Sequence, residues 1–281
     1  RYDTCSGIYR SVHLVSSDPV HADNWGIFVT TPEINGKEAV VKIETTVLNE
    51  SDKDAEVTVR HRIMEKDGYE ILGGCRKEVT VKNGGKAVVT QELLLEKPKL
   101  WSTDKPNLYT VLTTIYRNGV KVEESQTVTG IRSFAFDADK GFFLNGENMK
   151  IKGACLHHES VSLGAAVPPS IWKEKLQTLK TLGVNAVRMS HNPQAAAVYD
   201  LCDELGFLVM DEAFDEWGSP KRKWVEGWNV GNSPSMDGYA EFFEDWSVRD
   251  VTDMVLSGRN HPSIILWSIG NEIDYPNDPY S

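Results

Sequence analysis

The sequence has few cysteines, and they lie far apart. The four, Cys5, Cys75, Cys155 and Cys202, form no Cys-x-x-Cys pair. This spacing predicts neither a zinc site nor a disulfide framework. The default for each is an isolated buried thiol, so cysteine usage leaves the redox compartment open.

Positive charge is also scarce. The 281 residues include 30 Lys+Arg against 41 Asp+Glu, a net charge of −11. This balance argues against nucleic acid or an anionic membrane as partner, because both need a basic face on the protein. No apolar run is long enough to span a bilayer, and the first residues lack a signal-peptide pattern. Because the chain opens abruptly at Arg1, we expect a fragment whose targeting sequence lies upstream.

The composition is that of an ordinary soluble globular protein, with 40% hydrophobic and 25% charged residues, and the length predicts two domains. From residue 22 to residue 133, apolar and polar residues alternate with period two, as in Val41–Val47. Asn118-Gly119 predicts a type I′ hairpin turn. Short strands at this spacing predict an immunoglobulin-like β-sandwich. We expect Trp101 and Tyr109 to pack in its core, and we expect no site chemistry there.

After residue 134, apolar segments alternate with amphipathic helices, the first of which is expected to begin with Ser170 as its N-cap. This order predicts a parallel sheet with right-handed crossovers. No strand is followed by a GxGxxG turn, so a dinucleotide site has no support. A (β/α)8 barrel has its pocket at the carboxyl ends of its strands but needs about 250 residues, so we expect the first half of a barrel. The predicted strands are Lys150–Cys155, Ala186–Met189, Phe207–Met210 and Ile264–Ile269, and they lead into His157, His191, Glu212 and Glu272.

Six motifs in chain order resemble those of glycoside hydrolase family 2, the family of β-galactosidases, β-glucuronidases and β-mannosidases. They cover nearly the whole chain. The motifs are Ser6-Gly7-Ile8-Tyr9-Arg10, Leu100-Trp101-Ser102 with Pro106-Asn107-Leu108-Tyr109, Lys152-Gly153-Ala154-Cys155-Leu156-His157-His158, Arg188-Met189-Ser190-His191-Asn192-Pro193, Asp211-Glu212-Ala213, and Arg259-Asn260-His261-Pro262-Ser263 through Gly270-Asn271-Glu272.

The resemblance implies three domains. Residues 1–21 would be the C-terminal remnant of a jelly-roll sugar-binding domain, residues 22–133 the immunoglobulin-like sandwich, and residues 134–281 the N-terminal half of a TIM-barrel catalytic domain. Half a barrel would expose two sheet edges and an apolar inner face. We therefore expect this piece to aggregate or borrow strands from a neighbour, and homo-oligomerisation stays open.

The resemblance also implies hydrolysis of oligosaccharides or glycosides with retention, which uses two carboxyls about 5–5.5 Å apart. Glu272 matches the acid/base and Asn271 the residue that holds the sugar 2-hydroxyl. His157 and His191 match sugar-contacting histidines, and Arg188 matches an arginine beneath the catalytic carboxyls. The nucleophile follows the seventh barrel strand, beyond this chain, so the chain alone is expected to be inactive.

No cofactor is predicted. Glu216 aligns with a position that binds magnesium in some family members, but Gly218 stands where those members have a histidine, so magnesium stays open. Asp211 and Glu212 match an acidic pair expected to be structural first and electrostatic second. Trp217 is one of three loop tryptophans, of which we expect two to pack in the loop.

Several functions remain open at this stage. Ser190–Pro193 and residues 271–275 are closer to the β-galactosidases than to the glucuronidases. A β-glucuronidase or a β-mannosidase is the alternative within the family. From another class, the chain could be a non-catalytic carbohydrate-binding module with exposed aromatics on one sheet face, or a structural fragment.

Overall fold

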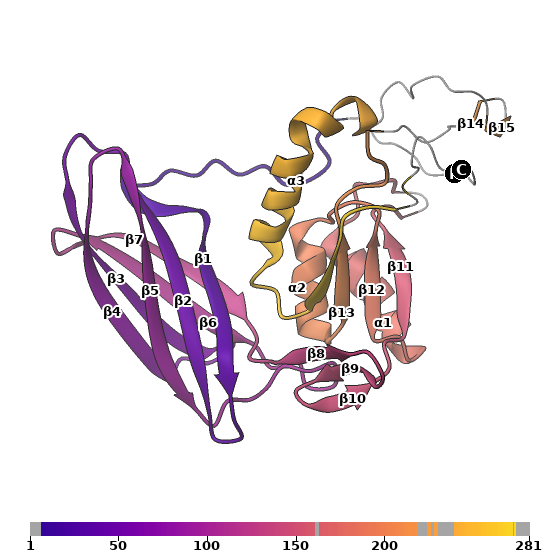
Figure 1. The fold of residues 1–281 in the computed structure, drawn as a ribbon, viewed down its shortest axis with the longest axis horizontal. Coiled ribbons are helices and arrows are strands. Elements are labelled where there is room, and N and C mark those ends of the chain that lie inside the picture. The colour runs from indigo at the N-terminus through magenta and orange to yellow at the C-terminus, as the bar shows by residue number, and fades with distance from the viewer. Residues whose placement is uncertain are drawn as a thin grey trace.

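The computed structural model describes residues 7–160, 163–218, 224–225, 228–229, 239–271 and 273. It consists of a β-sandwich, a small antiparallel sheet and a parallel sheet flanked by helices (Figure 1). This order confirms the predicted fold class, a sandwich followed by part of an α/β barrel. The exact domain boundaries stay a prediction.

The sandwich is built from seven long strands in two antiparallel sheets. Alternation along the strands places one set of side chains between the sheets, and β2 follows it residue by residue from Glu38 to Asn49. One sheet has the order β1-β2-β5 and the other β4-β3-β6-β7. The strands are β1 (Val20–Ile34), β2 (Glu38–Asn49), β3 (Ala55–Glu65), β4 (Gly73–Val81), β5 (Gly85–Glu96), β6 (Tyr109–Arg117) and β7 (Val120–Thr129).

Two sequence predictions in the sandwich are confirmed. Asn118 and Gly119 connect β6 to β7 with φ of 48° and 81°, the pair of positive values that a type I′ turn requires. Tyr109 is 2% exposed and packs in the sandwich core as predicted. Trp101 is 0% exposed but packs outside that core, in a cluster with residues of the small sheet and the parallel sheet.

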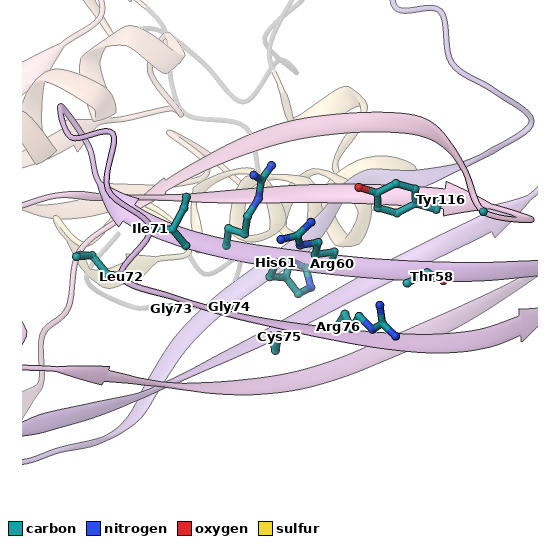
Figure 2. Close-up of a pocket in the computed structure, with 12 residues that line it drawn as sticks. Thr58, Arg60, His61, Ile71, Leu72, Gly73, Gly74, Cys75, Arg76 and Tyr116 are labelled. Atoms are coloured by element: carbon teal, nitrogen blue, oxygen red, sulfur yellow. The ribbon is translucent and has the colours of Figure 1, made fainter.

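The outer face of the β4-β3-β6-β7 sheet carries a hollow of about 880 Å³ (Figure 2). Arg60, Arg62 and Arg76 line it, together with Tyr116. A carbohydrate-binding face would be expected to present a row of exposed aromatic rings. Tyr116 is the one Tyr, Phe or Trp in this lining, so the hollow does not favour the carbohydrate-binding alternative.

His61 lies beneath this face and joins the two sheets through the core. Its side chain is 0% exposed. Its Nε2 lies 3.3 Å from Thr45 Oγ1 on β2, and its Nδ1 lies 3.1 Å from Thr113 Oγ1 on β6. Burial lowers the pKa of His61 to about 4, so the imidazole is neutral in the folded protein at pH 7.

We expect His61 to make the sandwich sensitive to acid. The unfolded imidazole has a pKa of about 6.5, so between about pH 6.5 and about pH 4 the unfolded state binds more protons. The free energy of unfolding therefore falls as the pH drops through this window, by up to about 3 kcal/mol. His61→Gln should remove this loss, as measured by urea midpoints at several pH values. Equal pH slopes in the two proteins would contradict this expectation.

A three-stranded sheet follows the sandwich. The sequence patterns did not predict this sheet. It consists of β8 (Phe134–Asp137), β9 (Gly141–Leu144) and β10 (Glu147–Met149) in the order β10-β9-β8. Asn145 and Gly146 turn the chain between β9 and β10 with φ of 52° and 82°. This Asn-Gly pair was a readable hairpin signal.

The parallel sheet has the order β11-β12-β13-β16, and helices lie between its strands in the chain. Strands pair in sequence order, as right-handed crossovers of half a barrel require. Within the described residues, β11 and β16 are its outer strands. The elements are β11 (Gly153–His157), α1 (Pro169–Thr181), β12 (Ala186–Ser190), α2 (Ala196–Leu205), β13 (Leu208–Glu212), β14 (Trp224–Val225), β15 (Trp228–Asn229), η1 (Tyr239–Glu241), α3 (Phe243–Gly258) and β16 (Ile264–Ser268).

Several sequence predictions about this half need correction. Ser170 does not cap α1: the helix begins at Pro169 and its N-cap is Pro168, because the fixed φ of proline suits the first helical position. β13 extends through Glu212, so Asp211 and Glu212 lie within the strand. Cys155 is exposed rather than buried. No helix within the described ranges is long and apolar enough to cross a membrane.

The sandwich is fastened to the parallel sheet by buried polar contacts. Trp101 donates from Nε1 to the carbonyl oxygen of Asp203 on α2 at 2.9 Å. Asn260, before β16, pairs with the backbone of β1 at Ile27 and Val29, at 2.8 Å and 2.9 Å. Gly206 ends α2 with φ of 71°, and a Cβ there would collide with the carbonyl oxygen of Thr103.

The small sheet and Trp101 close one end of the parallel sheet. Phe142 and Leu144 of β9 form a buried cluster with Trp101, Leu208 and Ile265, near the beginnings of β13 and β16. Figure 1 shows β8, β9 and β10 lying beneath these strands. At the opposite end of the parallel sheet, where the strands finish, the chain continues into loops.

Candidate active site

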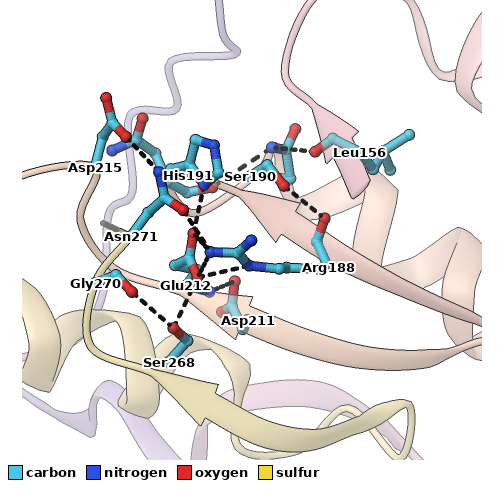
Figure 3. A network of polar contacts seen from close by, with 12 residues as sticks. Leu156, Arg188, Ser190, His191, Asp211, Glu212, Asp215, Ser268, Gly270 and Asn271 are labelled. Atoms are coloured by element: carbon cyan, nitrogen blue, oxygen red, sulfur yellow. Dashed lines mark hydrogen bonds and ion pairs between the residues drawn. The ribbon is translucent and has the colours of Figure 1, made fainter. Parts of the chain in front are cut away.

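A buried carboxylate, Glu212, lies at the centre of a polar network at the carboxyl ends of the parallel strands (Figure 3). Arg188 of β12 donates from Nε to Glu212 Oε2 at 2.8 Å and from Nη2 to Oε1 at 3.0 Å. Ser268, the last residue of β16, donates from Oγ to Oε2 at 2.7 Å. Side chains from three adjacent strands, β12, β13 and β16, therefore meet at Glu212. The register between β13 and β16 pairs Glu212 with Ser268.

The network keeps Glu212 ionised although it is 0% exposed. Burial by itself would raise the pKa of Glu212. Hydrogen bonds from Ser268, His191 and Arg188 outweigh it and hold the pKa below the usual value. Burial likewise opposes the charge of Arg188, but the bonds to Glu212 raise the pKa of its guanidinium. Both shifts favour the charged forms, so Arg188 and Glu212 form an ion pair at neutral pH.

The two predicted histidines pack against each other, and His191 contacts this ion pair. His191 Nδ1 lies 2.7 Å from Glu212 Oε1. Because a carboxylate only accepts hydrogen bonds, this contact places a proton on Nδ1, and in the neutral ring Nε2 is then an acceptor. His157, at the end of β11, packs edge-on against His191 with ring centroids 5.2 Å apart. Burial and the neighbouring His191 lower the pKa of His157. The Ser190–His191 peptide bond is cis.

Asn271 is fixed at both ends of its amide. Its Oδ1 accepts from Arg188 Nη2 at 2.8 Å, and its Nδ2 donates to Asp215 Oδ1 at 3.0 Å. Its backbone N–H donates to the carbonyl oxygen of Phe214 at 3.0 Å. An amide nitrogen carries two hydrogens, so one remains for a further acceptor such as a hydroxyl.

Asp211 connects Tyr199 to the backbone of Glu212. It accepts from the Tyr199 hydroxyl at 2.7 Å and from the backbone N–H of Glu212 at 3.1 Å. Burial raises the pKa of Asp211 to about 6, although both hydrogen bonds oppose this. Burial and the charge of Asp211 raise the pKa of Tyr199, so its hydroxyl remains a donor.

The structure places four of the five predicted site residues, His157, His191, Arg188 and Asn271, at one end of the parallel sheet. Their predicted roles toward a sugar stay predictions. Glu272, the fifth, lies outside the described residues. Sequence analysis did not single out Ser268 or Asp215, and it gave Glu212 a secondary role. Glu212 and Asp215 follow the predicted strand Phe207–Met210, and Ser268 lies near the end of the predicted strand Ile264–Ile269, which was the signal available.

The magnesium alternative gains no support from Glu216. Its side chain is 5% exposed, and its Oε1 accepts from the backbone N–H of Ala240 at 3.2 Å. Gly218 offers no side-chain ligand. In the part of the chain that the structure describes, no three His, Cys, Asp or Glu side chains gather into a metal-binding group.

Trp217 donates from Nε1 to the carbonyl oxygen of Ile269 at 2.8 Å and stacks on Phe243, so it packs within the loop. The side chains of the other two loop tryptophans, Trp224 and Trp228, lie outside the description.

Two family models match this chain in succession. The model for glycosyl hydrolases family 2 matches residues 23–132, and the model for the TIM barrel domain of glycosyl hydrolases family 2 matches residues 137–279. Together they cover the sandwich and the parallel sheet.

Individual proteins match over nearly the whole chain. A β-galactosidase of Bacteroides ovatus is 43% identical over 97% of this chain, which spans 30% of that relative. A β-glucuronidase of Bacteroides fragilis is 29% identical over 95% of this chain, spanning 37% of its length. The crystal structure of a glycosyl hydrolase family 2 member from Bacteroides cellulosilyticus has a TM-score of 0.84 and 37% identity, and it matches over 94% of this chain and 32% of its own. The chain therefore spans about a third of the length of its relatives.

Proposed function

This chain belongs to glycosyl hydrolase family 2, and we propose that it supplies half of the active site of a retaining exo-β-glycosidase that acts as a β-galactosidase. The full enzyme would remove terminal β-linked sugars from oligosaccharides or glycosides by double displacement. Glu272 is the proposed acid/base. The partner carboxylate, the nucleophile, would come from a barrel strand that this chain does not contain.

The observation that supports this proposal best is the convergence of His157, His191, Arg188 and Asn271, which lie on or just after β11, β12 and β16, at the carboxyl end of the parallel sheet. In barrel enzymes that end carries the chemistry. Asn271 precedes Glu272 directly in the sequence. Asn271 and His191 are both tied to the Arg188–Glu212 ion pair, the kind of rigid support that a binding site needs.

Each side chain has a task that its contacts allow. Glu272 would protonate the leaving oxygen and then deprotonate the attacking water. Asn271 would donate its free amide hydrogen to the sugar 2-hydroxyl, a contact that strengthens in the transition state. His191 would accept a hydrogen bond from a sugar hydroxyl at Nε2, because in the neutral ring the proton is on Nδ1 and is donated to Glu212. Arg188 would keep Glu212 ionised and hold Asn271.

Galactose is the proposed sugar because the 43% identical relative is a β-galactosidase, whereas a putative β-glucuronidase of Formosa agariphila is 37% identical and the β-glucuronidase of Bacteroides fragilis is 29% identical. The chain also resembles the galactosidase branch at Ser190–Pro193. Glucuronic acid differs from galactose by a carboxylate at C6 and by the configuration at C4, and the carboxylate would call for a cationic partner in the sugar pocket. The charge of Arg188 is already engaged by Glu212.

We expect the full-length protein to hydrolyse nitrophenyl β-galactoside faster than the matching glucuronide and mannoside. The measurement is kcat/KM for each substrate under identical conditions. A preference for the glucuronide would replace the galactosidase proposal by the glucuronidase one. Absence of turnover on all three would overturn the glycosidase proposal as stated.

A further inference from the structure

An extended arm precedes the sandwich and reaches the candidate site. Residues 7–19 form no strand or helix before β1 begins at Val20. In Figure 1 this arm leaves the sandwich and runs across toward the side of the molecule where α3 lies. Most of it is solvated, with Val12 75% exposed and Leu14 100% exposed. Packing of apolar side chains therefore does not hold it in place.

Arg10 ties the arm to the parallel-sheet half. Its Nη2 donates to the carbonyl oxygen of Pro193 at 3.0 Å, and its Nη1 lies 3.4 Å from the carbonyl oxygen of Gln194. Among the described residues of the arm, the hydrogen bonds to this half all come from Arg10. The two carbonyls lie two and three residues after His191, on the short segment between β12 and α2. A planar guanidinium can span two neighbouring acceptors, which a lysine ammonium does less well.

The same segment is gripped from the opposite side. The backbone N–H of Gln194 donates to the Tyr199 hydroxyl at 2.8 Å, and that hydroxyl donates to Asp211 at 2.7 Å. Gln194 is 5% exposed, so its backbone cannot shift without disturbing buried neighbours. The carbonyls of residues 193 and 194 face Arg10 while the amide of residue 194 faces the interior. His191 is therefore carried by a segment held from outside by the arm and from inside by Asp211.

The charge of Arg10 also acts on the edge of the site. Burial lowers the pKa of His158, and the nearby positive charge of Arg10 lowers it further. His158 directly follows His157, which packs against His191. The Arg10 guanidinium is thus close to His158, which follows His157, and to the backbone of residues 193 and 194, which follow His191.

We propose that Arg10 is a positioning residue for His191, so that the arm before the sandwich helps to set the geometry of the sugar site. This inference rests on the proposed function for its catalytic consequence, but its structural core, the clamping of residues 191–194, does not. Arg10 itself does not touch the proposed reacting atoms. Its removal should loosen the segment and misplace the imidazole, and misplacement of about 1 Å can lower a rate by about 100-fold.

The test uses the full-length protein with Arg10→Ala, Arg10→Lys and Val12→Ala, the last as a control on the same arm. Hydrogen exchange of the backbone around residues 191–195 is followed alongside kcat/KM. We expect faster exchange in this segment and a loss of about 10-fold or more in kcat/KM for Arg10→Ala. Added guanidinium should restore part of the lost activity, Arg10→Lys should lie between, and Val12→Ala should match the parent.

The two readouts separate the inference from the proposed function. Unchanged exchange at residues 191–195 in Arg10→Ala would overturn the inference, whether or not any glycoside is hydrolysed. Faster exchange with unchanged kcat/KM would overturn the positioning role. Faster exchange in a protein that cleaves no glycoside would support the clamp and reject the proposed function. A loss that Val12→Ala shares would show a general effect of the arm and would also overturn the role of Arg10.

Discussion

Glu272→Gln in the full-length protein should slow substrates with poor leaving groups by about 10²–10⁴-fold, and activated aryl glycosides much less. A glutamine fills nearly the same volume but cannot deliver a proton. An alkyl leaving group needs that proton to depart, whereas a dinitrophenolate does not. The measurement is kcat/KM over a series of aryl glycosides whose leaving groups span a range of pKa values.

The series contains its own control, because both substrate types meet the same variant. A loss that does not depend on the leaving group would show that Glu272 acts in another way, for example by holding the fold of the site. Glu204→Gln serves as a matched glutamate control, since Glu204 forms an exposed ion pair with Lys66 on the surface. It should leave both kcat/KM values unchanged.

Glu212→Ala should be the most damaging change that the described residues allow. It removes the carboxylate that accepts from Arg188, His191 and Ser268. A buried guanidinium without its partner costs about 3 kcal/mol or more, and the side chain of Arg188 is 31% exposed, which favours the lower end. We expect a lower urea midpoint and a loss of kcat/KM of about 100-fold or more, because His191 loses its hydrogen-bond acceptor and Arg188, which holds Asn271, loses its ion-pair partner.

The double variant Glu212→Ala with Arg188→Met distinguishes the two effects. Removing both charges should recover much of the stability, since no unpaired guanidinium remains. Activity should stay low, because His191 then lacks Glu212 and Asn271 lacks Arg188. Recovery of activity together with stability would contradict the positioning role of the Arg188–Glu212 pair. Glu204→Gln, with its exposed ion pair, should shift the urea midpoint only slightly.

The sequence predicted the strands and helices that carry this site, but it did not predict which side chains meet in it. Period-two alternation and the Asn118-Gly119 turn are local signals, and they identified the sandwich strands and one hairpin. Apolar runs ending in His157 and His191 identified two strand ends, since a strand is recognisable within five residues. The same local signal at Asn145-Gly146 would have identified the small sheet.

The central role of Glu212 could not be read from local patterns. It depends on the register of β13 against β16, which shifts between Val209 and Met210. Only this register places Ser268 opposite Glu212 and not one residue away. The contact between Arg10 and Pro193 joins positions 183 apart in the chain. No periodicity reaches that far, so such a contact appears only once the chain is folded.

The central claim is that Glu272 acts as the acid/base beside the network of Glu212, Arg188, His191 and Asn271. The most direct test is the addition of azide to the Glu272→Ala variant of the full-length protein, with an activated aryl glycoside as substrate. Without a general base, azide should attack the glycosyl-enzyme, raise the turnover rate and give a β-glycosyl azide of retained configuration. An α-glycosyl azide would identify Glu272 as the nucleophile, and an unchanged rate with no azide product would remove it from the reaction; either result would contradict the account.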